Sequence, residues 1–405
     1  MLSAEALTRA AELDWWRGVF AGGVPEPGLR KLETRDSAGT AVHLTITLPA
    51  GLTAPLLTTV PAGYHGAVND VLLTALAVAW SRWQDTALVL DLESHGREDS
   101  LAGVDLSGTL GWFTSIYPVR LDAGAVDWDE FLAGGPVVGR VLRRVKEQLR
   151  AVPGNGIGHG LLRHLNADTR EALAALPVPP LLFNYLGRFA IGEATAWDAA
   201  PEAEPMGDAF DPDMPLGHLL EVNCAARDVA GEPALTATWT WPDGVFADGE
   251  VAALARLWFD ALGALARHTG TGHSPSDFPL VALTQDEIDG YDAEVAGLAD
   301  VLPVTPLQEG LYFHAHVDGN AADLYVPQRH IDLSGPLDPG ALRRSAQDLL
   351  DRHAPLRASF RQRADGQVVQ LIAARVDAEW REAVGDPDEL AAAERARGST
   401  RRRGH

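Results

Sequence analysis

The sequence predicts an α/β or α+β fold, and three observations support this class. Residues 1–283 alternate between stretches with helical apolar spacing and short apolar runs of strand type. The chain has 405 residues, 46% of them apolar, which is enough to bury one or two substantial cores. Residues 270–300 are rich in Gly, Ser, Pro and acidic side chains, a composition typical of a surface linker that divides the chain.

The first zone contains several elements that can be placed in order. Apolar residues at helical spacing predict a largely buried helix over 68–80. The run 87–90 predicts a strand that ends in the polar stretch 91–100, where side chains can face a cleft. A second strand is predicted over 112–119, and Pro118 favours a sheet edge or a strand end. Further helices and strands are expected at 137–149, 161–176 and 251–262, and at 181–185, 219–225 and 235–241.

After the linker the pattern is sparser. A helix is predicted over 338–353 and a strand over 368–372. Roughly 80 residues is close to the lower limit for a self-sufficient core without disulfides or metal. The end of the chain is abruptly basic and poor in apolar residues, which predicts disorder.

Composition excludes several classes of function. With 33 basic and 56 acidic side chains the net charge is -23, so we expect no nucleic-acid partner. The lone Cys224 excludes an internal disulfide and a cysteine zinc cluster, which fits a reducing cytoplasm. Charged residues such as Glu5 and Arg9 interrupt any signal peptide, and no run of about 18 apolar residues occurs. We therefore expect a soluble, cytoplasmic protein with no membrane partner.

Three patterns invite a chemical interpretation and do not sustain it. The glycine-dense residues 154–160 lack G-x-G-x-x-G spacing and follow a helix, which favours a flexible loop beside a channel over a dinucleotide site. Residues 272–276 resemble a nucleophile elbow, but serine replaces the final glycine. The histidine pairs 159/164 and 314/316 do not have the spacing of a metal pair on one helix face, so no metal site is predicted.

The most informative stretch is 92–98, in which polar or small residues follow a strand that emerges from an apolar core. A carboxylate such as Glu93 can be partly desolvated there, which raises its pKa toward the range of a general base. His95 and Arg97 could instead hold that carboxylate ionised. A solvated loop with an Arg–Glu pair remains the structural alternative.

These residues and several others resemble the condensation and epimerization domains of nonribosomal peptide synthetases. Residues 93–98 are similar to the epimerization signature EGHGRE, with Ser94 in place of glycine. Other motifs of epimerization domains agree in order and spacing, and together they cover nearly all of residues 1–285: 68–73, 111–119, 158–165, 183–189 and 275–281. His159 and His164 stand where the family usually has tyrosine. Segments 302–311, 333–338 and 352–357 resemble the opening of a following condensation domain.

The resemblance implies a domain layout and a fold. Residues 1–285 would be the C-terminal lobe of an epimerization domain, with the chloramphenicol-acetyltransferase-like fold of a mixed sheet flanked by helices. A linker at 286–300 would lead to an incomplete N-terminal lobe of a condensation domain at 301–390, followed by a disordered basic tail at 391–405. The family places its HHxxxDG motif in the N-terminal lobe, and this sequence has no consecutive histidines. We therefore expect a fragment or truncated gene product.

The resemblance also implies a reaction and partners. A peptidyl carrier domain of a neighbouring synthetase module would present an aminoacyl or peptidyl thioester on phosphopantetheine, and no cofactor would be attached to this chain. Epimerization from L to D, an isomerase reaction, needs an acid–base pair on opposite sides of the α-carbon. Glu93 would be one catalytic partner, His95, Gly96 and Arg97 would shape the pocket, and Asn184 and Tyr185 would lie near the tunnel.

Because the second acid–base group is missing, we expect the isolated chain to be inactive. Two alternatives stay open at this point. One is a non-catalytic fragment that docks carrier or partner domains. The other is a condensation activity, an amide-forming acyl transfer completed by another polypeptide.

Overall fold

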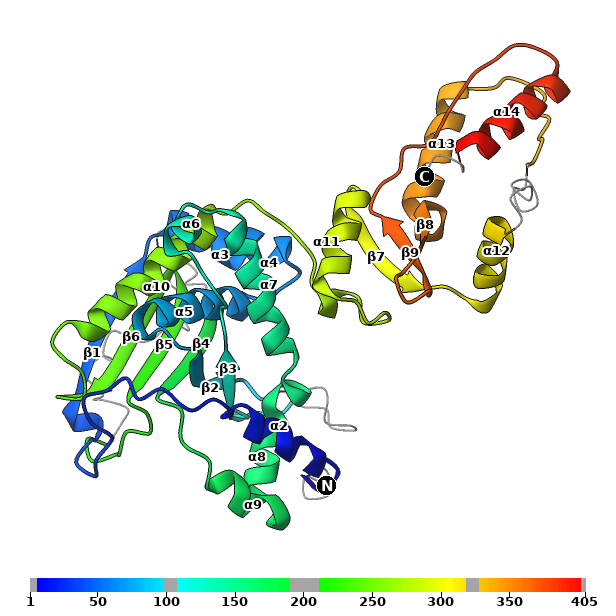
Figure 1. The fold of residues 1–405 in the computed structure, drawn as a ribbon. Helices are drawn as coiled ribbons and strands as arrows, with labels where there is room; N and C mark the ends of the chain where they lie inside the picture. The colour runs from blue at the N-terminus through cyan, green and yellow to red at the C-terminus, as the bar shows by residue number, and fades with distance from the viewer. Residues whose placement is uncertain (1–5, 98–107, 190–210, 230, 318–327, 402–405) are drawn as a thin grey trace. The chain divides into compact units, whose positions relative to one another are not determined.

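The structure is a computed structural model that describes residues 6–97, 108–189, 211–229, 231–317 and 328–401. These residues form two compact units, Met1–Gly272 and His273–His405 (Figure 1). Each unit contains a sheet flanked by helices, which confirms the predicted mixed α/β class.

The first unit is organised around a six-stranded sheet in the order β1-β6-β5-β4-β2-β3. Strands β2, β4 and β5 are parallel, whereas β1, β6 and β3 pair antiparallel with their neighbours, so the sheet is mixed. Pro118 lies in the edge strand β3, as predicted, where one side of the strand needs no ladder hydrogen bonds. The strand bounds are β1 (Ala41–Leu48), β2 (Leu88–Ser94), β3 (Ser115–Leu121), β4 (Leu181–Phe189), β5 (Leu220–Val229) and β6 (Glu232–Pro242).

Side-chain alternation gives this sheet one apolar and one polar face. Leu88, Leu90 and Leu92 of β2 are buried in the core, so Asp91 and Glu93 point to the opposite face. On that opposite face β1 and β6 are joined by cross-strand hydrogen bonds between threonine hydroxyls, Thr45–Thr238 and Thr47–Thr236, at 3.1 and 3.2 Å. Titratable side chains on this face are therefore outside the apolar core.

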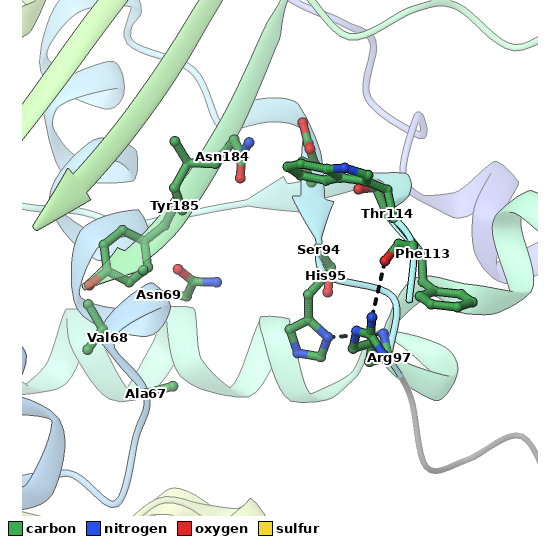
Figure 2. A pocket seen from close by; sticks show the side chains of 15 residues that line it. Ala67, Val68, Asn69, Ser94, His95, Arg97, Phe113, Thr114, Asn184 and Tyr185 are labelled. Atoms are coloured by element: carbon green, nitrogen blue, oxygen red, sulfur yellow. Dashed lines mark hydrogen bonds between the residues drawn. The ribbon is translucent and has the colours of Figure 1, made fainter. Parts of the chain in front are cut away.

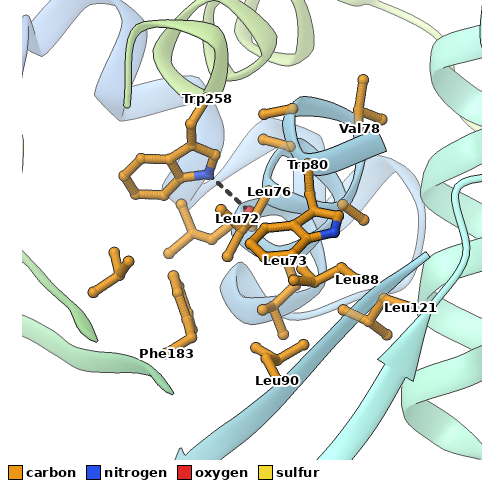
Figure 3. Close-up of a cluster of buried hydrophobic side chains, with 14 of the residues drawn as sticks. Leu72, Leu73, Leu76, Val78, Trp80, Leu88, Leu90, Leu121, Phe183 and Trp258 are labelled. Carbon is orange, nitrogen blue, oxygen red and sulfur yellow. Dashed lines mark hydrogen bonds between the residues drawn. The ribbon is translucent and has the colours of Figure 1, made fainter. Parts of the chain in front are cut away.

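Helices cover the apolar face, and α5 (Val68–Gln84) is the central one. All residues from Asp70 to Trp80 are buried, as expected of a helix enclosed on every side. Trp258 donates its indole N–H to the Leu72 carbonyl at 3.1 Å, which ties α10 to α5 within the core (Figure 3). The other helices of this unit are α2 (Leu13–Gly18), α3 (Ala50–Leu57), α4 (Thr59–Gly63), α6 (Trp128–Leu132), α7 (Pro136–Arg150), α8 (Ile157–His164), α9 (Ala167–Ala174) and α10 (Glu250–Arg267).

The glycine-dense segment differs from the prediction. Residues 157–160 form the first turn of α8 rather than a flexible loop, and the helix expected over 161–176 is split into α8 and α9. Asn166 causes the split, because its side chain caps α9 by accepting from the Asp168 N–H at 2.9 Å. Gly158 serves close packing, since a Cβ there would lie 1.9 Å from a carboxylate oxygen of Glu12.

The second unit has a three-stranded antiparallel sheet in the order β7-β9-β8, with β7 (Leu298–Pro303), β8 (Ala358–Gln362) and β9 (Val368–Ala373). Its core also includes apolar residues that precede β7, namely Phe278, Val281, Leu283 and Ile288. The expected linker over 286–300 is therefore wrong: those residues fall in α11 (Gln285–Glu294) and β7. Few apolar side chains anchor these residues, and the surrounding polar residues and glycines gave the stretch the composition of a linker.

The remaining helices of the second unit are α12 (Pro306–Val317), α13 (Pro339–Arg352) and α14 (Pro387–Arg401). Helix α13 confirms the prediction for 338–353, although none of its residues is buried. The tail expected to be disordered from 391 is helical to Arg401. Asp386 caps the first turn of α14, and the alanine-rich sequence that follows favours a helix. Across the described parts of the chain, no helix is both long and apolar enough to cross a membrane.

Candidate active site

A pocket of about 490 Å³ opens where β2 and β4 end (Figure 2). It gathers five of the six predicted site residues, which are Glu93, His95, Arg97, Asn184 and Tyr185. The sixth, Gly96, lies between two of them in the chain and is not part of the wall. The other lining residues are Ala67, Val68, Asn69, Ser94, Gly111, Trp112, Phe113, Thr114, Leu186 and Gly187.

Glu93 is the acid–base candidate of this pocket. Its strand position places the side chain on the polar face of the sheet, opposite Ile116 of β3. Burial raises the pKa of the Glu93 carboxyl above its usual value, and the negative charge of Glu221 raises this pKa further. Among the described residues, Glu93 has no hydrogen-bond or ion-pair partner. The carboxyl can therefore hold and release a proton closer to neutral pH than an exposed glutamate.

Gly96 forms the sharp turn after β2. Its φ of +62° lies in the left-handed region, and a Cβ at this position would sit 1.6 Å from the Phe113 carbonyl oxygen. Only glycine lets the backbone of the 111–114 segment pass so close to the end of β2. This turn brings the Glu93 strand end and the aromatic segment onto the same pocket.

Arg97 stabilises the opposite wall. Its guanidinium donates to the carbonyl oxygens of Thr109 and Gly111 at 3.0 and 3.1 Å, and lies 4.6 Å from the centre of the Phe113 ring. Arg97 does not hold the Glu93 carboxylate ionised, since Glu93 has no ion-pair partner among the described residues. Glu98, the last residue of the predicted motif, lies outside the described residues.

His95 has a defined tautomer in this turn. The backbone N–H of Arg97 donates to His95 Nδ1 at 3.0 Å (Figure 2). Because Nδ1 accepts, the neutral ring carries its proton on Nε2. The exposed imidazole can thus offer a hydrogen-bond donor to a molecule bound in the pocket.

Asn184 and Tyr185 line the pocket from β4. Asn184 shares the sheet face of Glu93, and Tyr185 follows it at the irregular register of β4 with β5. Burial raises the pKa of Tyr185 to about 12, so its hydroxyl stays protonated and can donate. Figure 2 shows the Tyr185 ring near Val68, at the start of α5.

Asn69 and Trp112 are two notable lining residues outside the predicted set. Asn69 has a buried Oδ1 that lacks a hydrogen-bond partner in the described chain, although the residue lines the pocket. Trp112 is 90% exposed at the pocket mouth. Sequence motifs placed Asn69 at the start of a helix and Trp112 in a strand, and neither residue was assigned to the site. The available signals were the polar side chain of Asn69 at a helix start and the aromatic side chain of Trp112 next to a glycine.

The described residues contain no group of three or more His, Cys, Asp or Glu placed to hold a metal ion. What the pocket does combine is a partly desolvated carboxyl, an imidazole N–H, a tyrosine hydroxyl and the Asn69 amide oxygen. Such a set can transfer a proton to or from a bound molecule and orient it by hydrogen bonds.

Comparison with protein families gives a match over most of the chain. The family model described as "Condensation domain" matches residues 4–207 and 298–399. A linear gramicidin synthase polypeptide of Brevibacillus parabrevis is 36% identical over 358 residues, which are 86% of this chain and 4% of that protein. Chondramide synthase of Chondromyces crocatus is 32% identical over 94% of this chain and 10% of that protein. The chain thus spans a small part of the length of these relatives.

Comparison with solved structures points to the same fold. The epimerization domain from the third module of tyrocidine synthetase B has 28% sequence identity and a TM-score of 0.53, with 65% of this chain and 57% of that chain covered. The first unit therefore has the chloramphenicol-acetyltransferase-like architecture, a mixed sheet flanked by helices, that the sequence predicted.

Proposed function

The chain belongs to the condensation-domain family of nonribosomal peptide synthetases, and from this premise we propose that it epimerizes the α-carbon of an aminoacyl or peptidyl thioester. The substrate would be presented by a peptidyl carrier domain on a phosphopantetheine arm. The product, of D configuration, would pass to a downstream condensation domain.

The observation that carries this proposal is the state of Glu93. The thioester acidifies the α-hydrogen, and the base that removes it needs a pKa near the working pH. Burial and the charge of Glu221 raise the pKa of Glu93 in this direction, and no described side chain pairs with its carboxyl. Support for epimerization over amide formation comes from the 93–98 motif and from the likeness to an epimerization domain.

The rest of the pocket fits such a substrate. Its volume of about 490 Å³ falls in the roughly 300–1,000 Å³ range of small-molecule sites. Asn69 and the Tyr185 hydroxyl are available to bind amide or carbonyl groups of the aminoacyl end. Gly96 and Arg97 hold the wall in place, so we assign them a positioning role.

The second acid–base group has to come from elsewhere. Inversion needs a proton donor on the face of the α-carbon opposite the base, and the chain has no consecutive histidines. We assign this group to an HHxxxDG lobe on another stretch of polypeptide. The first unit, which ends at Gly272, would be the complementary lobe, and residues 301–390 of the second unit would be the start of a condensation domain.

The test is exchange of the α-hydrogen in deuterated water with an aminoacyl carrier. The chain alone should give no incorporation, and the chain mixed with an HHxxxDG lobe from a relative should give incorporation. Glu93→Gln should lower that rate by about two to four orders of magnitude. Glu232→Gln is the matched control, since Glu232 is an exposed carboxyl on β6 of the same sheet that does not line the pocket.

Exchange that persists in Glu93→Gln would refute the assigned role. Amide formation between two carrier-bound groups, without exchange, would instead identify a condensation activity. Carrier binding without either reaction would identify a docking fragment.

A further inference from the structure

A second pocket, of about 200 Å³, shares no lining residue with the first. It opens on the polar face of the same sheet, beside Asp91, two residues before Glu93. Its walls are Phe20, Ile116, Pro118 and residues 176–179, together with a group of titratable side chains: Asp91, His159, Arg163, His164 and His218. Nothing in the proposed epimerization uses these residues.

The Arg163 guanidinium of this pocket has no partner among the described residues. It is half-buried on α8, and it forms no hydrogen bond or ion pair with any described residue. Other arginines with comparable burial are satisfied within the protein, for example Arg30 by Asp36 and Arg363 by Glu287. A guanidinium has five N–H donors in a planar fork. A guanidinium at a pocket wall whose donors have no acceptor in the protein can bind an oxyanion.

The acidic side chain in the wall of this pocket already has a hydrogen-bond partner. Asp91 is the one acidic residue in the described wall, and His218 Nε2 donates to its carboxylate at 2.9 Å. The His218 and Asp91 side chains are largely buried, with 11% and 14% exposed. Glu221 lies 4.0 Å from the other ring nitrogen of His218. An anion bound beside Arg163 therefore meets an Asp91 carboxylate that already accepts a hydrogen bond from His218.

The protonation pattern of His159 indicates which kind of anion the pocket would bind. Its Nδ1 lies 3.3 Å from the Ile116 carbonyl oxygen, and a carbonyl only accepts, so Nδ1 carries the proton. Burial lowers the pKa of His159, which favours the neutral ring with a free lone pair on Nε2. A wall with both a guanidinium donor and an imidazole acceptor suits an anion that itself carries a hydroxyl, as hydrogen phosphate does and a carboxylate does not.

We propose that this second pocket binds a phosphate group, as the free ion or as the end of a phosphate monoester, with the Arg163 guanidinium as its charged partner. The proposal goes beyond the epimerization assigned to the first pocket and does not depend on it. The small volume admits little more than the phosphate and the first atoms of an ester.

The test is calorimetric titration of the full chain with inorganic phosphate at pH 7 and constant ionic strength. We expect saturable one-site binding that Arg163→Gln weakens at least about tenfold, because a charge-assisted bidentate contact is lost. Arg140→Gln, at an exposed arginine of α7, is the matched control and should bind as the wild type does. Acetate should bind more weakly than phosphate.

His159→Asn is a second variant and should also weaken phosphate binding. Circular dichroism spectra and melting temperatures check that both variants fold. Methyl phosphate that binds as tightly as phosphate supports an ester ligand, and binding of inorganic phosphate alone supports the free ion. The absence of saturable binding to the wild type, or equal affinity in folded Arg163→Gln, would overturn the proposal.

Discussion

Replacing Gly96 with alanine should destabilise the first unit, because two separate costs fall on one residue. The φ of +62° is unfavourable for an L side chain, at about 1 kcal/mol. The new Cβ would lie 1.6 Å from the Phe113 carbonyl oxygen, and moving that backbone costs about 1–3 kcal/mol more. The sum of about 2–4 kcal/mol corresponds to a fall in melting temperature of roughly 4–16 °C for a unit of this size.

Gly187→Ala is the matched control for this prediction. Gly187 lines the pocket and likewise has a positive φ, of +96°, but nothing lies within 4 Å of its Cβ position. It should therefore show only the conformational cost of about 1 kcal/mol. Urea unfolding of both variants, followed by tryptophan fluorescence, measures the difference. Equal destabilisation by the two substitutions would refute the argument that the Gly96 turn is closed by the Phe113 backbone.

Three further changes test other parts of the structure. Arg150→Met should cost about 3 kcal/mol in unfolding experiments, because it leaves Asp70, 1% exposed, without its ion-pair partner; an unchanged stability would show that the pair is dispensable. Asp36→Asn should lower stability at pH 7, because Arg30 holds the pKa of Asp36 at about 2. As the pH falls from about 4 to 2 the wild type loses this contribution, so urea midpoints of the two proteins should converge; a constant gap would contradict it. Leu76→Ala, at a fully buried position, should cost about 2–5 kcal/mol, and calorimetry should show the loss in the first unit.

The elements predicted well are those with strong apolar periodicity. Helix α5 and strands β2, β5 and β6 occur where the sequence placed them, because their buried side chains recur at helical or strand spacing. Strand β1 was missed although the local signal is present: Val42, Leu44, Ile46 and Leu48 alternate with His43, Thr45 and Thr47. Its partner β6 lies about 190 residues later in the chain.

The first pocket was predictable in part for the same reason. Glu93, His95 and Arg97 lie close together in a polar stretch that ends a buried strand, and Asn184 and Tyr185 belong to the neighbouring parallel strand. Asn69 was missed as a site residue, because its role depends on how the start of α5 meets the ends of β2 and β4. The linker prediction for 286–300 was wrong for a different reason. A few apolar residues anchor this stretch in the core of the second unit, although its overall composition is that of a linker.

The two pockets follow from one property of β2, the alternation of its side chains. Leu90 and Leu92 face the core, so Asp91 and Glu93 must both face the polar side, about 6–7 Å apart along the strand. Among the described residues, Glu93 is left without a partner and its pKa rises, whereas Asp91 is engaged by His218, a residue from 127 positions later in the chain. The same strand therefore presents one carboxyl without a partner among the described residues and one carboxyl that is hydrogen-bonded to His218. That difference is set by residues that no local pattern could reveal. It is why the first pocket suits proton transfer while the second, where no described residue pairs with Arg163, suits an anion.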